Sequence, residues 1–366
     1  MSNYLKKFSV LLLILFLGFS VSKLQAQTHE THENHDTHKT EKKFDPGKTI
    51  IEHIGDAYDW HIFTIGETHV SIPLPVILYS EKSGFHMFMS SKFEHGHAEH
   101  DGFKICSDEK SSYKGKIIEM IDGKPARPYD ISITKNTLSL FFSIALILWV
   151  FISVAKTYKR REGKAPKGIQ SLLEPLILFI TNDVAKASIG EKKYMKFVPY
   201  LLTIFFFIFL NNLMGLIPFF PGGANLTGNI AITMVLALFT FVITTINSNK
   251  NYWTHIFNTP GVPWWLKLPV PLMPFVEVLG IFTKPFVLMV RLFANMTAGH
   301  IVALGFFSLI FIFGEKSVGA GYGVSVLSIA FTIFLTFLEL LVAFIQAYVF
   351  TLLSALYFGM ATEEHH

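Results

Sequence analysis

Two apolar stretches near the C-terminal end of the sequence, residues 272–313 and 324–360, are each long enough to cross a lipid bilayer. The first nevertheless contains Arg291, with about a dozen mostly apolar residues on either side. A guanidinium keeps its proton, and placing it in hydrocarbon costs at least ~2.5–3.5 kcal/mol. Such a charge persists where it faces a counter-charge or water, so Arg291 is a candidate functional residue. A side chain that extends to the lipid headgroups is the alternative, although the long flanks make that reach difficult.

The composition also indicates a membrane protein. Hydrophobic residues make up 51% of the 366 residues and charged residues only 16%, whereas soluble domains contain about 25% charged residues. The formal net charge of +4 is small for this length and argues against nucleic acid as a partner. The single cysteine, Cys106, excludes an internal disulfide and a cysteine-based metal site.

The first 26 residues predict a secretory signal peptide. Lys6 and Lys7 precede a short apolar core at residues 8–21, and Ala26 offers a small residue for cleavage. This core is shorter than the ~20 residues that a spanning helix needs. A retained anchor is the alternative, because Leu24 stands where a small residue is preferred.

Residues 27–135 form a polar segment that we expect to lie outside the cytoplasm. Alternation at residues 62–70 and 77–79 predicts some strand structure. Four histidines recur at every third position and could bind zinc or copper, although a solvated segment in which they never converge is the favoured interpretation. These histidines are His29, His32, His35 and His38. We expect the segment to be dispensable for transport across the membrane.

From residue 136 onward the sequence predicts an all-α polytopic membrane domain with about five spans. Residues 138–154 form the first, and the cations that follow it up to Lys167 mark the cytoplasmic side. A cleaved signal peptide gives the same orientation, with the C-terminus in the cytoplasm. Residues 171–196 predict an amphipathic helix at the cytoplasmic interface. The remaining predicted spans are residues 197–218, 230–246, 272–313 and 324–360.

The last two predicted spans form a long helical hairpin. At 1.5 Å per residue they reach ~55–60 Å, whereas the hydrocarbon core is ~30 Å thick. A steep tilt, or a course along the membrane plane, would use this length. The glycines of residues 314–323 predict the turn between them.

Ionisable residues within this hairpin suggest a proton path. Histidine and a buried glutamate can take and release protons near neutral pH, whereas arginine repels a proton. We therefore expect Glu277 on an inner path, His300 and Glu339 on an outer path, and Arg291 as the block between them. Helical spacing turns His300 about 180° from Arg291. A structural salt bridge between Glu339 and His300, and an interfacial position for Glu277, are the alternatives.

The residues around Arg291 resemble a known family. Lys284-Pro-Phe-Val-Leu-Met-Val-Arg291-Leu-Phe-Ala-Asn295-Met, together with the motif at residues 212–218 and Gln346-Ala-Tyr-Val-Phe, is similar to subunit a of the bacterial F-type ATP synthase. The resemblance implies that Arg291 is the essential arginine, Asn295 its polar neighbour and Gln346 the glutamine of the last helix. It matches Glu277 to a carboxylate of the inner half-channel. His300 and Glu339 look exchanged relative to many members, and Gly215 stands where some members have aspartate.

The resemblance implies a non-catalytic, proton-translocating stator subunit in the bacterial inner membrane, with no cofactor and no metal. Its expected partners are a ring of c subunits, the peripheral-stalk b subunits, the soluble ATPase head and membrane lipid. The sequence has no phosphate-binding loop, so ATP chemistry is expected on partner subunits. A stand-alone secondary proton transporter would predict inverted repeats, and an intramembrane metalloprotease would need a motif such as H-E-x-x-H. The sequence shows neither pattern. The alternative to a role in transport for Gln346 is that its side chain joins two helices by a hydrogen bond.

Overall fold

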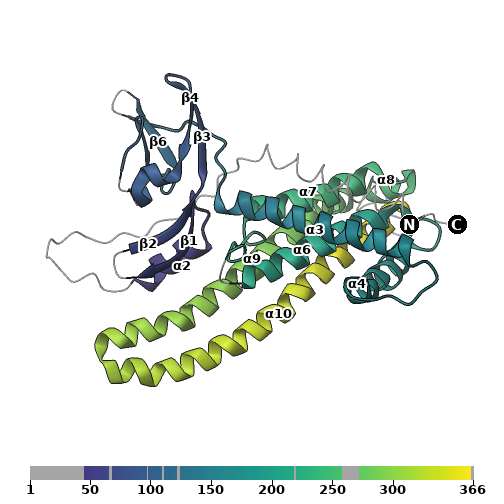
Figure 1. Cartoon of the computed structure of the whole chain (residues 1–366). Coiled ribbons are helices and arrows are strands. Elements are labelled where there is room, and N and C mark those ends of the chain that lie inside the picture. The colour runs from purple at the N-terminus through teal and green to yellow at the C-terminus, as the bar shows by residue number, and fades with distance from the viewer. Residues whose placement is uncertain are drawn as a thin grey trace.

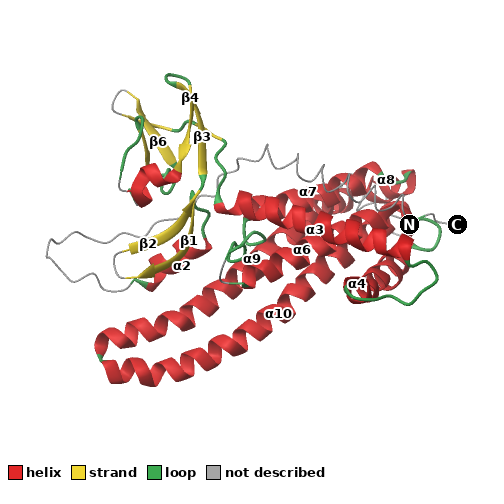
Figure 2. Ribbon diagram, in the orientation of Figure 1, coloured by secondary structure: helices red, strands yellow, loops and turns green. Residues whose placement is uncertain are grey.

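Long helices make up most of the chain, and all strands among the described residues lie within residues 59–130 (Figure 2). The computed structural model describes residues 45–65, 68–96, 98–108, 111–121, 124–217, 220–257 and 272–363. The predicted signal peptide and the four regularly spaced histidines lie outside these residues. The predicted helical membrane fold with a long C-terminal hairpin is confirmed.

The polar N-terminal segment forms a β-rich domain preceded by a short helix. Its buried apolar side chains include Val76, Leu78, Phe93, Phe103 and Ile117. Strand alternation directs Val76 and Leu78 of β3 into this core while their neighbours remain accessible. The sequence pattern indicated only part of this structure, because most of the strands are short. The elements are α2 (Pro46–Ile54), β1 (Asp59–Ile65), β2 (Thr68–Pro73), β3 (Pro75–Ser80), β4 (Gly84–Met89), η2 (Ser90–Gly96), β5 (Phe103–Ile105), β6 (Ile117–Ile121), β7 (Lys124–Ala126) and β8 (Tyr129–Asp130).

The strands form three small antiparallel sheets. β1 pairs with β2 in a hairpin, β3 lies between β4 and β8, and β6 lies between β5 and β7. In the central sheet, Val76 lies opposite Phe88 and Tyr79 lies opposite both Phe85 and Tyr129. The domain ends at β8, and four residues separate β8 from the first long helix, which begins at Lys135.

Four described helices are long and apolar enough to span a membrane by length and composition, which makes the chain a multi-pass membrane protein. A fifth span is possible if α7 and α8, which are bent by 102° at a short break, count as one. The predicted spans agree with these helices to within a few residues, apart from the hairpin. The helices are α3 (Lys135–Arg160), α6 (Tyr194–Leu216), α7 (Ile230–Ile246), α8 (Lys250–Phe257), α9 (Leu272–Lys316) and α10 (Val318–Thr362).

The predicted interfacial helix at residues 171–196 is broken into three pieces. α4 (Ile169–Leu178) continues into a π-helical segment, η3 (Phe179–Lys186), and then into the short α5 (Ala187–Ile189). The run ends at Gly190, whose φ of 89° lies in the left-handed region that favours glycine. The periodicity predicted one helix because it does not distinguish an α-turn from a wider π-turn.

α9 and α10 lie side by side as an antiparallel hairpin (Figure 1). The prediction of a glycine-rich turn was wrong, because α9 ends at Lys316 and α10 begins at Val318. Ser317 joins them and caps α10, its hydroxyl oxygen accepting from the Ala320 amide at 3.1 Å. Gly321 belongs to α10, and a Cβ on it would lie 2.8 Å from the Cα of Gly314. The glycines therefore allow the two helices to approach closely.

α6 lies at the centre of the helical bundle, where most of its side chains are buried. Asn212 joins three segments: its side-chain amide donates to the Ala343 carbonyl of α10 at 3.1 Å, and its oxygen accepts from Thr227 at 2.6 Å. The end of α10 is also held, because the Thr362 carbonyl accepts from Lys193 at 2.8 Å and from Asn249 at 2.9 Å. These contacts hold α10 against the bundle along its second half.

We predict that Gly359→Ala destabilises the bundle. A Cβ at this position would collide with the backbone carbonyl of Ser188, so α10 and α5 would have to separate, at roughly 1–3 kcal/mol. Gly323→Ala is the matched control, since it lies on the same helix with open space around it. Thermal unfolding of the purified complex should show a lower midpoint for the first variant alone. Equal midpoints would show that the two helices tolerate the extra methyl.

Candidate functional site

α9 has one face packed on the bundle and one face open. Leu288, Leu292 and Met296 are buried, whereas Arg291 and Asn295 are exposed. Residues three and four apart share a helix face, so this division follows from the sequence spacing. Arg291 has no hydrogen bond or ion pair with the residues that the structure describes. A guanidinium in this position needs a partner beyond the described part of the chain.

His300 and Glu339 line one cavity between α9 and α10, together with Asn295. The cavity has a volume of about 240 Å³. Two glycines make room for these side chains: a Cβ on Gly299 would lie 3.0 Å from Oε1 of Glu339, and one on Gly215 would lie 3.5 Å from Nε2 of His300. The pair predicted for the outer path is therefore brought to one place, on the C-terminal side of Arg291 along α9.

Nε2 of His300 and Oε1 of Glu339 are buried, and neither has a hydrogen-bond partner among the described residues. The two side chains therefore do not form the direct salt bridge that was the alternative interpretation. Buried polar atoms are normally satisfied by protein or by water, and a cavity of this volume has space for several water molecules. Water between the two groups would connect them into one hydrogen-bonded chain.

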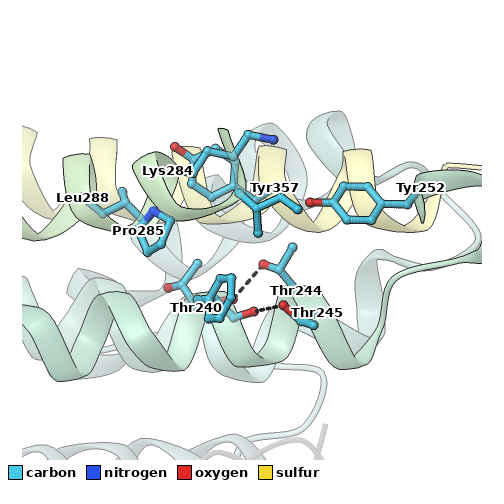
Figure 3. Close-up of a pocket in the computed structure, with 10 residues that line it drawn as sticks. Thr240, Thr244, Thr245, Tyr252, Lys284, Pro285, Leu288 and Tyr357 are labelled. Carbon is cyan, nitrogen blue, oxygen red and sulfur yellow. Dashed lines mark hydrogen bonds between the residues drawn. The ribbon is translucent and has the colours of Figure 1, made fainter. Parts of the chain in front are cut away.

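A second, smaller cavity lies on the other side of Arg291 along α9. It has a volume of about 20 Å³, and Figure 3 shows the side chains around it. Hydroxyl groups predominate among its polar members, whereas Lys284 contributes the ammonium. The labelled residues in Figure 3 are Thr240, Thr244 and Thr245 of α7, Tyr252 of α8, Lys284, Pro285 and Leu288 of α9, and Tyr357 of α10.

Several of these side chains have defined partners. Thr240 exchanges a hydrogen bond with Tyr200 at 2.6 Å and lies 3.2 Å from the hydroxyl of Ser354. The ammonium of Lys284 lies over the ring of Tyr357, 5.6 Å from its centroid. Glu277 is close enough to interact electrostatically with Lys284 and with Tyr252. The carboxylate predicted for the inner path therefore lies within electrostatic range of two residues that line this cavity, although it does not line the cavity itself.

Gln346 is buried, with 7% of its surface exposed, on the part of α10 that packs against the bundle. Its side chain makes no hydrogen bond within the described residues, so the alternative of a bond between two helices is not found there. Within the described ranges, no group of three or more histidine, cysteine or acidic side chains could hold a metal ion. Cys106 is a buried free thiol.

Sequence reasoning missed the hydroxyl side chains of the second cavity. Thr240 and Thr244 stand four residues apart on a helix whose other residues, apart from Thr233 and Thr245, are apolar, and this spacing is the signal that could have identified them. It is a weak signal, because Thr244 donates to the carbonyl four residues before it, at 2.7 Å, as threonines in helices commonly do. Tyr252 and Tyr357 belong to distant segments, and only the fold brings them together.

Comparison with known proteins gives two family matches. Residues 137–359 match the family described as "ATP synthase A chain", and residues 49–132 match "Domain of unknown function (DUF8433)". These ranges coincide with the helical part and with the β-rich domain.

Curated relatives agree with the first match. "ATP synthase subunit a 2" of Chlorobaculum tepidum is 47% identical over 240 residues, which cover 64% of each chain. "ATP synthase subunit a" of Chloroherpeton thalassium is 44% identical over 246 residues, covering 65% of this chain and 69% of the relative. "ATP synthase subunit a" of Myxococcus xanthus is 42% identical over 267 residues, which cover 71% of this chain and 82% of the relative. The chain thus spans slightly less than two thirds of the first of these relatives. Because the matched residues include Arg291 and both cavities, the chain belongs to the ATP synthase A chain family.

Proposed function

We propose that this chain is the proton-translocating stator subunit in the membrane sector of an F-type ATP synthase. One observation carries the proposal. Along α9, the residues that line one cavity lie between 281 and 288 and those that line the other lie between 295 and 302, while Arg291 lies between the two sets on the exposed face. Two cavities that each contain polar side chains, separated along the helix by a fixed positive charge, are what two half-channels require.

The exposed face of α9 is the surface that we assign to a ring of carboxylate-bearing c subunits. A ring carboxylate beside Arg291 is held ionised, because the neighbouring guanidinium favours the charged form. It accepts a proton on one side of Arg291 and releases one on the other. Arg291 itself prevents direct passage between the half-channels, since it repels a proton and does not release its own.

His300 and Glu339 supply the outer half-channel, and Glu277 with the hydroxyl-lined cavity supplies the inner one. Imidazole and carboxyl groups sharing a cavity pass a proton by taking it at one atom and releasing it at another. The hydroxyls of Thr240 and Tyr252 orient water and do not change charge near neutral pH. The role of Asn295 and Gln346 is to hold the ring carboxylate and water near Arg291 by hydrogen bonds.

A stand-alone transporter would enclose its path within one chain. Here Arg291 is exposed and lacks an ion-pair partner in the described residues, so the proposed path needs a second protein. The peripheral-stalk b subunits and the soluble ATPase head complete the proposed assembly. ATP chemistry takes place on those partners, and this chain is non-catalytic.

The proposed orientation places the β-rich domain outside a bacterial inner membrane and the C-terminus in the cytoplasm. The cationic residues that follow α3 support this orientation, because such residues mark the cytoplasmic side. They lie at the end of the bundle away from the β-rich domain, where the Thr362 carbonyl near the end of α10 accepts hydrogen bonds from Lys193 and Asn249 (Figure 1). We propose residues 1–26 as the signal peptide, 27–135 as the external segment and 136–366 as the transmembrane domain. The start of α3 at Lys135 supports the second boundary.

We predict that Arg291→Ala abolishes both ATP-driven proton pumping and ATP synthesis in inverted vesicles, because the block between the half-channels is lost. Arg291→Lys should fail as well, since an ammonium does not reproduce the planar guanidinium. Lys316→Ala, at the far end of the same helix, is the control and should pump normally. Coupled synthesis by the Arg291→Ala complex would contradict the proposed role.

The exchanged pair gives a second prediction. His300→Ala and Glu339→Ala should each slow pumping strongly, because the remaining partner is left alone in a poorly solvated cavity. The double exchange, His300→Glu with Glu339→His, should recover more activity than either single exchange. Pumping rates of the four combinations are compared after immunoblots confirm equal assembly. A double exchange no better than the worse single one would mean that the two groups are not one relay.

Deletion of residues 28–43 should leave proton pumping intact if the signal peptide is kept. This stretch contains the four regularly spaced histidines and lies before the described β-rich domain. The measurement is ATP-driven acidification by vesicles that contain equal amounts of assembled complex. Complete loss of pumping in such vesicles would assign the histidines a direct part in transport.

A further inference from the structure

The β-rich domain contacts the helical bundle near the outer cavity. α2 packs against α9 (Figure 1). Trp60 of β1 packs edge-on against Phe220, which follows α6, with ring centroids 5.1 Å apart. Lys135, the first residue of α3, donates from Nζ to the backbone carbonyl of His53 at 3.0 Å. The domain is therefore held in place over the end of the bundle where α9 carries His300.

His53 of α2 is near enough to His300 to interact with it electrostatically, and so is Lys135. The two histidines differ in their contact with solvent. His53 is exposed, whereas His300 is partly buried and its Nε2 is fully enclosed beside Gly215. These groups therefore form a series from the outside inward. His53 is in contact with solvent, His300 is near His53, and His300 lines the cavity that contains Glu339.

We propose that α2 forms the outer mouth of the proton path and that His53 passes protons between the external solvent and His300. This inference rests on the proposed function and deepens it. It also departs from the expectation that residues 27–135 are dispensable for transport, because α2 belongs to that segment.

The chemistry is a balanced transfer. The imidazole of His53 takes a proton from external water at one ring nitrogen and gives one from the ring to His300, directly or through water, which returns His53 to its neutral form. Desolvation by the crowded surroundings lowers the pKa of His53 although part of the ring reaches solvent, and the charges of Lys135 and His61 lower it further. The ring is therefore neutral at neutral pH and gains its proton as the outside becomes acidic. The groups around it are Lys135 of α3, His61 of β1, His300 of α9 and Asp56 after α2.

A reversible block at position 53 tests the proposal. His53→Cys is made in a chain that also carries Cys106→Ser, so that one thiol remains in it, and the whole complex is purified. The thiol is modified with a positively charged methanethiosulfonate, and the complex is reconstituted for ATP synthesis driven by an imposed proton gradient. Met87→Cys in the same background is the control, because Met87 lies in the same domain and is 66% exposed.

Modification at position 53 should lower the rate of synthesis by about tenfold, because a fixed positive charge close to the path repels an incoming proton strongly enough to change the rate by that factor. A reducing agent that removes the label should restore the rate, which a purely structural defect would not allow. The labelled Met87→Cys complex should synthesise normally. Equal rates for the two labelled complexes would overturn the proposal.

A second variant covers the case in which the cysteine chain assembles poorly. His53→Gln keeps the backbone carbonyl that Lys135 contacts and cannot titrate. It should change how the synthesis rate depends on external pH in the acid range, and an unchanged profile would overturn the proposal. Arg291→Ala in the same background separates the two proposals. Coupled synthesis by that variant contradicts the proposed function. Loss of synthesis in that variant, together with His53 variants that behave like the unchanged chain, contradicts only the role of α2 as the outer mouth.

Discussion

A guanidinium that keeps its proton must be matched by charge or water wherever it lies in a membrane. In this chain Arg291 is on the open face of α9 and lacks an ion-pair partner among the described residues. The rest of the arrangement follows from that constraint. The opposite face of α9 packs on the bundle through Leu288, Leu292 and Met296, and the two cavities with polar side chains lie before and after the arginine. Around its axis, α9 therefore has one exposed face and one packed face. Along its length, it has one cavity before Arg291 and one after it.

Small residues give the polar groups their space. Gly215 and Gly299 leave room for His300 and Glu339, so two ionisable side chains share one cavity between packed helices. Larger side chains at either position would fill the volume that water needs. In the other cavity the space is much smaller, and hydroxyls line it where the outer cavity has ionisable side chains. The two ends of the proposed path thus differ in chemistry: the outer cavity holds an imidazole and a carboxyl group, whereas the inner cavity holds mostly hydroxyl groups beside the ammonium of Lys284.

Much of this organisation was predictable from the sequence because helical phase is a strong signal in long apolar segments. The half-turn between Arg291 and His300 predicted that the two side chains differ in exposure, and Arg291 is exposed whereas His300 is partly buried. Other features depend on the fold. The glycines near Ser317 gave a false turn, because glycine also serves close helix packing. The hydroxyls around Tyr357 gave little signal, and the contact of α2 with α9 joins residues more than 200 positions apart in sequence.

The attachment of α10 has a mechanical consequence. Its last turn is fastened through Thr362 to Lys193 and Asn249, whereas the Ser317 end of the hairpin projects past the bundle (Figure 1). In the proposed assembly, a ring that turns against α9 would push sideways on this hairpin, which is attached to the bundle at only one end. The close contact of Gly314 with Gly321 couples the two helices at the far end, so they deflect together. In that assembly the attached end of α10 would resist the sideways force, and the position of Arg291 relative to the proposed ring would depend on the stiffness of the two helices.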